Sequence, residues 1–115
     1  MEKLLNSSID KIKIDCGVDI SMDKILDFDP VPFDKEISST IKGATEQLGL
    51  QNLNIVSGAG HDAVNMQKIV PSGMIFIPCK DGISHNEAEH ADPHHVSAGA
   101  NVLLHTIIDL ADNKE

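Results

Sequence analysis

The chain has 115 residues and a formal net charge of −9, from 18 acidic and 9 basic side chains. Its length fits about one small domain. A surface that binds phosphate groups needs the opposite sign of charge, which argues against a nucleic-acid partner. No basic cluster or apolar run is long enough to bind a membrane surface or to cross a membrane.

The N-terminal stretch shows no secretory signal, so we expect a cytoplasmic protein. Cys16 and Cys79 lie far apart in the sequence. Because two cysteines in a cytoplasmic chain are more often free thiols than a disulfide, we expect free thiols.

The beginning of the chain is expected to form a helix and then a strand. Apolar side chains at helical spacing predict a helix near residues 2–14, and Gly17 suits its C-terminal cap. Apolar and polar side chains then alternate, which predicts a half-buried strand over 18–28. Two prolines in 29–32 restrict their neighbours, so this segment is the expected hinge between two parts of the chain.

The middle of the chain is expected to form a helix, a short strand and a second helix. Asp34 suits the N-cap of the first of these helices, and Gly49 suits its end. The apolar face of this helix is formed by Ile37, Ile41, Ala44 and Leu48. Residues 53–56 predict a short strand that leads into a glycine-rich turn at 57–60, and residues 63–69 predict a short helix.

The last part of the chain is expected to form a strand, a long loop and a final helix. The continuous apolar run 74–77 predicts a strand that is buried on both faces. The polar loop 78–91 has the length of a functional loop, and Asp92 and Pro93 suit the start of the last helix. The broad apolar face of that helix is formed by Val96, Ala100, Leu103, Leu104, Ile107 and Ile108. The alternation of helices and strands predicts an α/β fold.

Two turns each place one histidine beside a carboxylate, directly after a short apolar run. Residues 57–62 read Ser-Gly-Ala-Gly-His-Asp and contain His61, and residues 80–89 read Lys-Asp-Gly-Ile-Ser-His-Asn-Glu-Ala-Glu and contain His85. Turns at strand ends are where an α/β scaffold presents reactive side chains. We therefore expect one composite site.

The residues alone leave other interpretations open. His85 could be a solvated loop histidine, and His61 could cap the turn that contains it. A phosphate-binding loop at 57–60 has the wrong spacing and lacks the lysine that would follow. A metal tract formed by His90, His94 and His95 is a further alternative. Because Pro93 interrupts the helix register among them, we expect these histidines to be solvated.

Four segments within residues 32–110 resemble a known family. They read Ser-Gly-Ala-Gly-His-Asp-Ala, Pro-Ser-Gly-Met-Ile-Phe-Ile-Pro, Lys-Asp-Gly-Ile-Ser-His-Asn and Ala-Gly-Ala-Asn-Val-Leu-Leu. Together they are similar to the C-terminal part of the metal-dependent amidohydrolases that include N-carbamoyl-L-amino acid hydrolase, allantoate amidohydrolase and β-ureidopropionase. These enzymes belong to the aminoacylase and carboxypeptidase G group of zinc-peptidase-like proteins. Four motifs in order make a specific match.

The resemblance implies an architecture and an incomplete enzyme. Residues 32–115 would be the C-terminal part of a three-layer α/β catalytic domain, and residues 1–31 would be a helix–strand remnant of the lid (dimerisation) domain. Family members are several times longer, and their upstream His-x-Asp and Glu-Glu motifs supply most metal ligands and the catalytic glutamate. We expect these motifs to be missing, so the chain would be a fragment that is inactive by itself and carries no catalytic residue.

The resemblance also implies roles for the two histidines. His85 matches the last metal ligand of the family, which binds two divalent ions, zinc or manganese, and Glu89 is a candidate partner for its ring. His61 matches a histidine that holds the substrate or the developing oxyanion. The substrate of the parent enzyme would be a small carbamoyl or ureido compound, whose C–N bond is hydrolysed.

Other classes of function remain as alternatives. The chain could be a non-catalytic binding or structural module, or one half of a split enzyme. We also expect a homo-oligomer, because a sheet without its remaining strands leaves an open edge and bare apolar surface. Exchange of the first helix and strand across the hinge would be a low-cost route to it.

Overall fold

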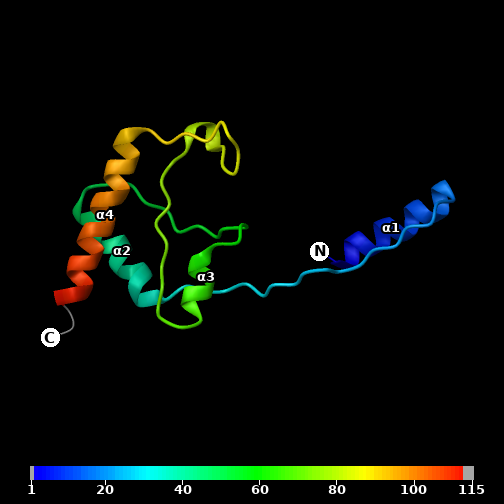
Figure 1. Ribbon diagram of the computed structural model, residues 1–115, viewed down its shortest axis with the longest axis horizontal. Helices are drawn as coiled ribbons and strands as arrows, with labels where there is room; N and C mark the ends of the chain where they lie inside the picture. The colour runs from blue at the N-terminus through cyan, green and yellow to red at the C-terminus, as the bar shows by residue number, and fades with distance from the viewer. Residues whose placement is uncertain (1, 113–115) are drawn as a thin grey trace. The chain divides into compact units, whose positions relative to one another are not determined.

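The computed structural model describes residues 2–112, and Figure 1 shows the course of the chain. Its regular structure consists of α1 (Glu2–Cys16), α2 (Lys35–Gln47), α3 (Asp62–Gln67), the 3-10 turn η1 (Lys80–Gly82) and α4 (Pro93–Asp112). The chain divides between Pro30 and Val31 into two compact units.

The sequence predicts strands over 18–28, 53–56 and 74–77, and this prediction is wrong for the described residues, which contain no strand. A strand exists only where a neighbouring segment completes its ladder of hydrogen bonds. Within residues 2–112 no segment pairs with these three in that way. The α/β class with three layers is therefore not formed by this part of the chain alone.

The first unit contains α1, which ends where the sequence predicts. Gly17 has a φ of 63°, and its N–H donates to the carbonyl oxygen of Lys13 at 3.0 Å. Lys24 pairs with Asp27 and with Glu2, and these two carboxylates, Asp27 first, raise the pKa of Lys24. None of the described residues of this unit is buried. An isolated helix of 15 residues is marginal in water, so packing within this unit adds little to the stability of α1.

The second unit begins with α2, whose two ends also confirm the sequence prediction. Asp34 caps it, since its Oδ1 accepts the N–H groups of Glu36 and Ile37 at 2.9 and 3.0 Å. At the other end Gly49 has a φ of 68°, a conformation that favours glycine. The N–H of Leu50 then donates to the carbonyl oxygen of Thr45 in the helix at 3.0 Å. These local signals define where the helix begins and where it ends.

The core of the second unit is a narrow seam between α2 and α4. Ala44 is 0% exposed, and Thr45, Val102 and Thr106 are buried around it. The two threonine hydroxyls donate to the carbonyl oxygens one turn earlier, each at 2.7 Å, so their burial leaves no unpaired group. Small and β-branched side chains thus form the contact between the helices.

The broad apolar face that the sequence indicates on α4 is not the face that packs against α2 within the described residues. The large side chains of the predicted face are all exposed: Val96, Leu103, Leu104, Ile107 and Ile108. The helix uses Val102 and Thr106 for its contact with α2 instead. A helix that is apolar on more than one side has a second face to bury, and residues 2–112 do not bury it.

The extended segment 71–79 lies against both helices. The N–H of Asp34 donates to the carbonyl oxygen of Ser72 at 3.0 Å. A Cβ on Gly73 would lie 2.7 Å from Cγ2 of Ile37, and a Cβ on Gly99 would lie 2.6 Å from Cγ2 of Ile77. The close approach of Gly73 to Ile37 and that of Gly99 to Ile77 therefore depend on the absence of a side chain at the two glycines.

Only one side of this segment packs against the helices. Side chains alternate along an extended chain, so Phe76 points away from the side that Gly73 and Ile77 turn to the helices. Phe76 is 47% exposed. The prediction of a segment buried on both faces is thus wrong for residues 2–112, because the outer side meets the ring of His61 but stays half exposed.

Candidate functional site

His61 precedes α3 and its ring is held from two sides. The ring Nε2 lies 2.7 Å from Oγ of Ser57, and the same oxygen accepts the N–H of Ala59 at 3.2 Å. The edge of the ring meets Phe76, with 5.5 Å between centroids and 66° between planes. His61 is half-buried. The turn therefore presents an imidazole in a defined orientation.

The side chain of His61 is not needed to begin α3. His61 is the N-cap residue by backbone conformation, with φ −132° and ψ 146°, but its side chain makes no cap hydrogen bond. Its carbonyl oxygen accepts the N–H of Val64 at 3.0 Å. His61 is thus the N-cap residue of α3 through its backbone, while its ring bonds to Ser57 within the turn and not to the helix.

His85 occupies a closed loop in an unusual backbone conformation. Its φ is 55°, and Asp81 within η1 has a φ of 57°. A residue with a Cβ adopts this left-handed region at a cost of about 1–2 kcal/mol, and such strain clusters at functional sites. The N–H of Lys80 donates to the carbonyl oxygen of His90 at 2.7 Å and closes the loop. The imidazole of His85 is exposed.

Glu89 holds the backbone of His85 and not its ring. Oε2 of Glu89 accepts the backbone N–H of His85 at 2.9 Å, and Oε1 lies 3.8 Å from Sγ of Cys79. Among the described residues no hydrogen bond reaches the imidazole of His85. The expected role of Glu89 as partner of the ring is thus replaced by a role in shaping the loop.

Within the described residues His85 is not part of a cluster of potential metal ligands. A protein zinc site uses about three or four protein ligands. Across residues 2–112, one set of three potential ligands has its donor atoms within 4.8 Å of one another, and that set is Asp92, His94 and His95. It excludes His85. A single imidazole fits a divalent ion chemically but forms only a fraction of its coordination sphere.

The cluster Asp92, His94 and His95 lies at the start of α4. The two rings have centroids 3.9 Å apart, and His90 Nε2 lies 3.7 Å from Oδ1 of Asp92. His90-Ala91-Asp92 is a His-x-Asp triplet, which corrects the expectation that this motif is missing. The triplet is exposed and follows His85 in sequence. The partial positive charge of a helix N-terminus opposes a cation at this position.

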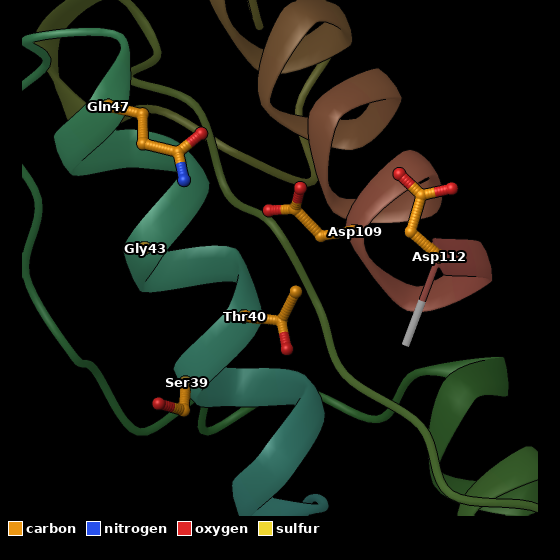
Figure 2. A pocket seen from close by; sticks show the side chains of 6 residues that line it. All are labelled: Ser39, Thr40, Gly43, Gln47, Asp109 and Asp112. Atoms are coloured by element: carbon orange, nitrogen blue, oxygen red, sulfur yellow. The ribbon is translucent and has the colours of Figure 1, made fainter. Parts of the chain in front are cut away.

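A hollow between α2 and α4 does not coincide with either histidine. It has a volume of about 370 Å³ and is lined by Ser39, Thr40, Gly43, Gln47, Asp109 and Asp112. Figure 2 shows the two carboxylates of α4 opposite the polar side chains of α2. Neither His61 nor His85 lines it. In Figure 1 the segments 57–61 and 80–90, which carry His61 and His85, extend away from the α2–α4 pair.

No helix within residues 2–112 combines the length and the apolar character needed to cross a membrane.

The chain matches known proteins along most of its length. Residues 6–109 match the model of peptidase family M20/M25/M40. An N-carbamoyl-L-amino-acid amidohydrolase of Rhizobium meliloti is 42% identical over 112 residues, which are 97% of this chain and 27% of that protein. An allantoate amidohydrolase of Escherichia coli is 39% identical over 102 residues, which are 89% of this chain and 24% of that protein.

Solved structures give the same result. A hydantoinase/carbamoylase family amidase from Burkholderia multivorans superposes with a TM-score of 0.86 and 41% sequence identity. That match covers 94% of this chain and 26% of the amidase chain. The chain therefore spans about a quarter of the length of the relatives that it matches.

Proposed function

The chain belongs to peptidase family M20/M25/M40, and on that premise we propose that it supplies the C-terminal part of a metal-dependent amidohydrolase. The reaction is hydrolysis of a C–N bond in an N-carbamoyl amino acid or in a related ureido or allantoate compound. One observation carries the proposal: the 42% identity to the Rhizobium meliloti amidohydrolase extends over 97% of the chain. The stretch matched by the family model includes the turns of both His61 and His85.

The proposed fold is completed by polypeptide outside residues 2–112. Segments 53–56 and 71–79 would join a sheet as strands, with α2 and α4 on one of its faces. Support comes from the half-exposed side chain of Phe76 and from the exposed side chains of Leu53, Ile55 and Val56. Residues 1–31 would form the remnant of a lid domain, and residues 32–115 a part of the catalytic domain.

The proposed role of His85 is that of a metal ligand. Its exposed imidazole is free of hydrogen bonds within the described residues. Its loop is closed by the hydrogen bond between Lys80 and His90 and by the bond from the backbone of His85 to Glu89. Zinc or manganese is the ion that this donor suits in the parent enzyme. When bound, two such ions would activate a water molecule and polarise the scissile carbonyl group.

The proposed role of His61 is to hold the substrate. Its ring is oriented by Ser57 and Phe76 and projects from a turn, so it can offer a hydrogen bond to a carbonyl or carboxylate oxygen. We propose that the turns of His61 and His85 open at the same end of the completed sheet. The general base would come from other polypeptide, so the chain by itself would be inactive.

An exchange of segments tests the proposal. In the Rhizobium meliloti amidohydrolase the matching 27% of the enzyme is replaced by this chain, and hydrolysis of N-carbamoyl-L-amino acids is measured with manganese or zinc. We expect the hybrid to be active. His85→Ala should lower kcat/KM by more than the ~10–100-fold that follows when a ligand merely loses its supporting hydrogen bond. His90→Ala, in the same exposed loop, is the matched control.

Two results would count against the proposal. One is a folded hybrid without activity. The other is an active hybrid in which His85→Ala has no more effect than His90→Ala, since a metal ligand cannot be dispensable. In the second case the chain would act as a non-catalytic structural part of the assembly.

A further inference from the structure

We propose that Ser57 is a positioning residue that fixes the neutral ring of His61 with its proton on Nδ1. The inference rests on the proposed role of His61 and goes beyond it, because it names the atom that meets the substrate. The donor offered to a substrate oxygen is then the Nδ1–H group of His61, and Nε2 is reserved for the protein.

The hydrogen bonds of Ser57 carry the inference. A serine hydroxyl has one proton to donate and two lone pairs that accept. One lone pair accepts the N–H of Ala59 at 3.2 Å, which fixes the position of the oxygen. Within residues 2–112 the other polar partner of this oxygen is Nε2 of His61, at 2.7 Å. Donation from Oγ–H to Nε2 therefore uses the hydroxyl proton inside the turn.

In the opposite arrangement Nε2–H would donate to Ser57, and the hydroxyl oxygen would accept twice. The proton of this exposed hydroxyl would then point to solvent and would not bind the turn together. The tautomer of a histidine is set by the hydrogen bond that its other nitrogen makes. The bond from Ser57 therefore leaves the proton on Nδ1.

The contact with Phe76 adds a second restraint. An edge-to-face arrangement at 5.5 Å limits rotation of the His61 ring about its side-chain bonds. Asp62 is the adjacent carboxylate, but among residues 2–112 no hydrogen bond joins it to the ring. With Nε2 occupied and the ring restrained, Nδ1–H is the polar group that remains free for a ligand.

Nitrogen-15 NMR on the full chain tests the inference without any need for activity. Long-range proton–nitrogen spectra distinguish the two tautomers, and they are recorded at alkaline pH, where an ordinary imidazole is neutral. We expect His61 with its proton on Nδ1. Ser57→Thr keeps the hydroxyl and should keep this pattern, whereas Ser57→Ala should move His61 toward the Nε2–H form. Ser84→Ala, in the turn of His85, is the matched control.

The same variants separate this inference from the proposed function. In the active hybrid, Ser57→Ala should lower kcat about tenfold, less than the ~10²–10³-fold loss of an oxyanion donor itself, and Ser57→Thr should restore most of it. An Nε2–H tautomer in the unmodified chain would overturn the inference even if the hybrid is active. An unchanged tautomer in Ser57→Ala with retained helix content would overturn it as well.

Discussion

Glu89 accepts the backbone N–H of His85 at 2.9 Å and thereby holds the loop of the proposed metal ligand while leaving its ring free. The backbone of His85 is left-handed, with a φ of 55°. A charge-assisted hydrogen bond is stronger than a neutral one and offsets part of the cost of that conformation. The two residues therefore act together: one presents the imidazole and the other holds it in place.

Removing this carboxylate should loosen the loop. In Glu89→Ala we expect faster hydrogen exchange at the amide of His85, because that N–H loses its acceptor. In the hybrid enzyme we expect metal affinity to fall by about 10–100-fold. Glu87→Ala changes an exposed acid in the same loop and should affect neither quantity. Equal effects of the two variants would show that net charge, and not the bond to His85, is responsible.

The cap of α2 should contribute measurable stability. Asp34→Ala removes the acceptor of two N–H groups and should lower the free energy of unfolding by about 1 kcal/mol. Asp34→Asn keeps an oxygen and should cost less. Urea unfolding followed by the helical circular dichroism signal measures both. Asp29→Ala, in the hinge segment, should be neutral, and a larger loss there would contradict the assignment.

A methyl group at two glycines should disturb the second unit. Gly73→Ala and Gly99→Ala would place a Cβ 2.7 and 2.6 Å from the γ2 methyl groups of Ile37 and Ile77. These methyl groups are held at a stiff, branched Cβ, so we expect each variant to lose about 1–3 kcal/mol of stability.

A third glycine provides the control for this pair. Gly43 lies inside α2 and has open space around an added Cβ. Gly43→Ala should therefore stabilise the helix by about 0.5–1 kcal/mol. Destabilisation by all three variants in the same thermal unfolding experiment would mean that the close approaches do not exist in solution.

The isolated chain should associate with itself. The exposed apolar face of α4 and the open side of segment 71–79 are surfaces that favour association. We expect a dimer or a higher oligomer in sedimentation equilibrium at micromolar concentration. Leu104→Lys should weaken it, and Asn101→Lys, which adds the same charge without removing apolar surface, should not. A stable monomer would show that the chain covers these faces by itself.

The sequence predicted the helices well because their signals are local. Asp34, Gly49 and Gly17 define helix ends through hydrogen bonds to their own neighbours, and these are confirmed. The strands could not be predicted in the same way. An extended apolar segment becomes a strand only when another segment pairs with it, and residues 2–112 contain no such partner for 53–56 or 74–77.

The candidate site was predictable in part for the same reason. The motifs identified the family to which the chain belongs, and the roles that they suggest for His61 and His85 stay predictions. They did not identify Ser57 as the partner of His61 or show that Glu89 bonds to a backbone N–H. Such contacts depend on the path of the backbone through a turn, which spacing in the sequence does not specify.

The closed loop of His85 has a consequence for the order of assembly. Two hydrogen bonds close the loop, from Lys80 to His90 and from His85 to Glu89, and they join residues at most ten positions apart. Short-range contacts form early, since little chain entropy is lost when a small loop closes. If the proposed enzyme assembles from several parts, the loop that carries the imidazole of His85 would thus form before the parts dock. Docking would then order few additional groups. The entropic cost of association would be small, and the affinity between the parts would be correspondingly higher.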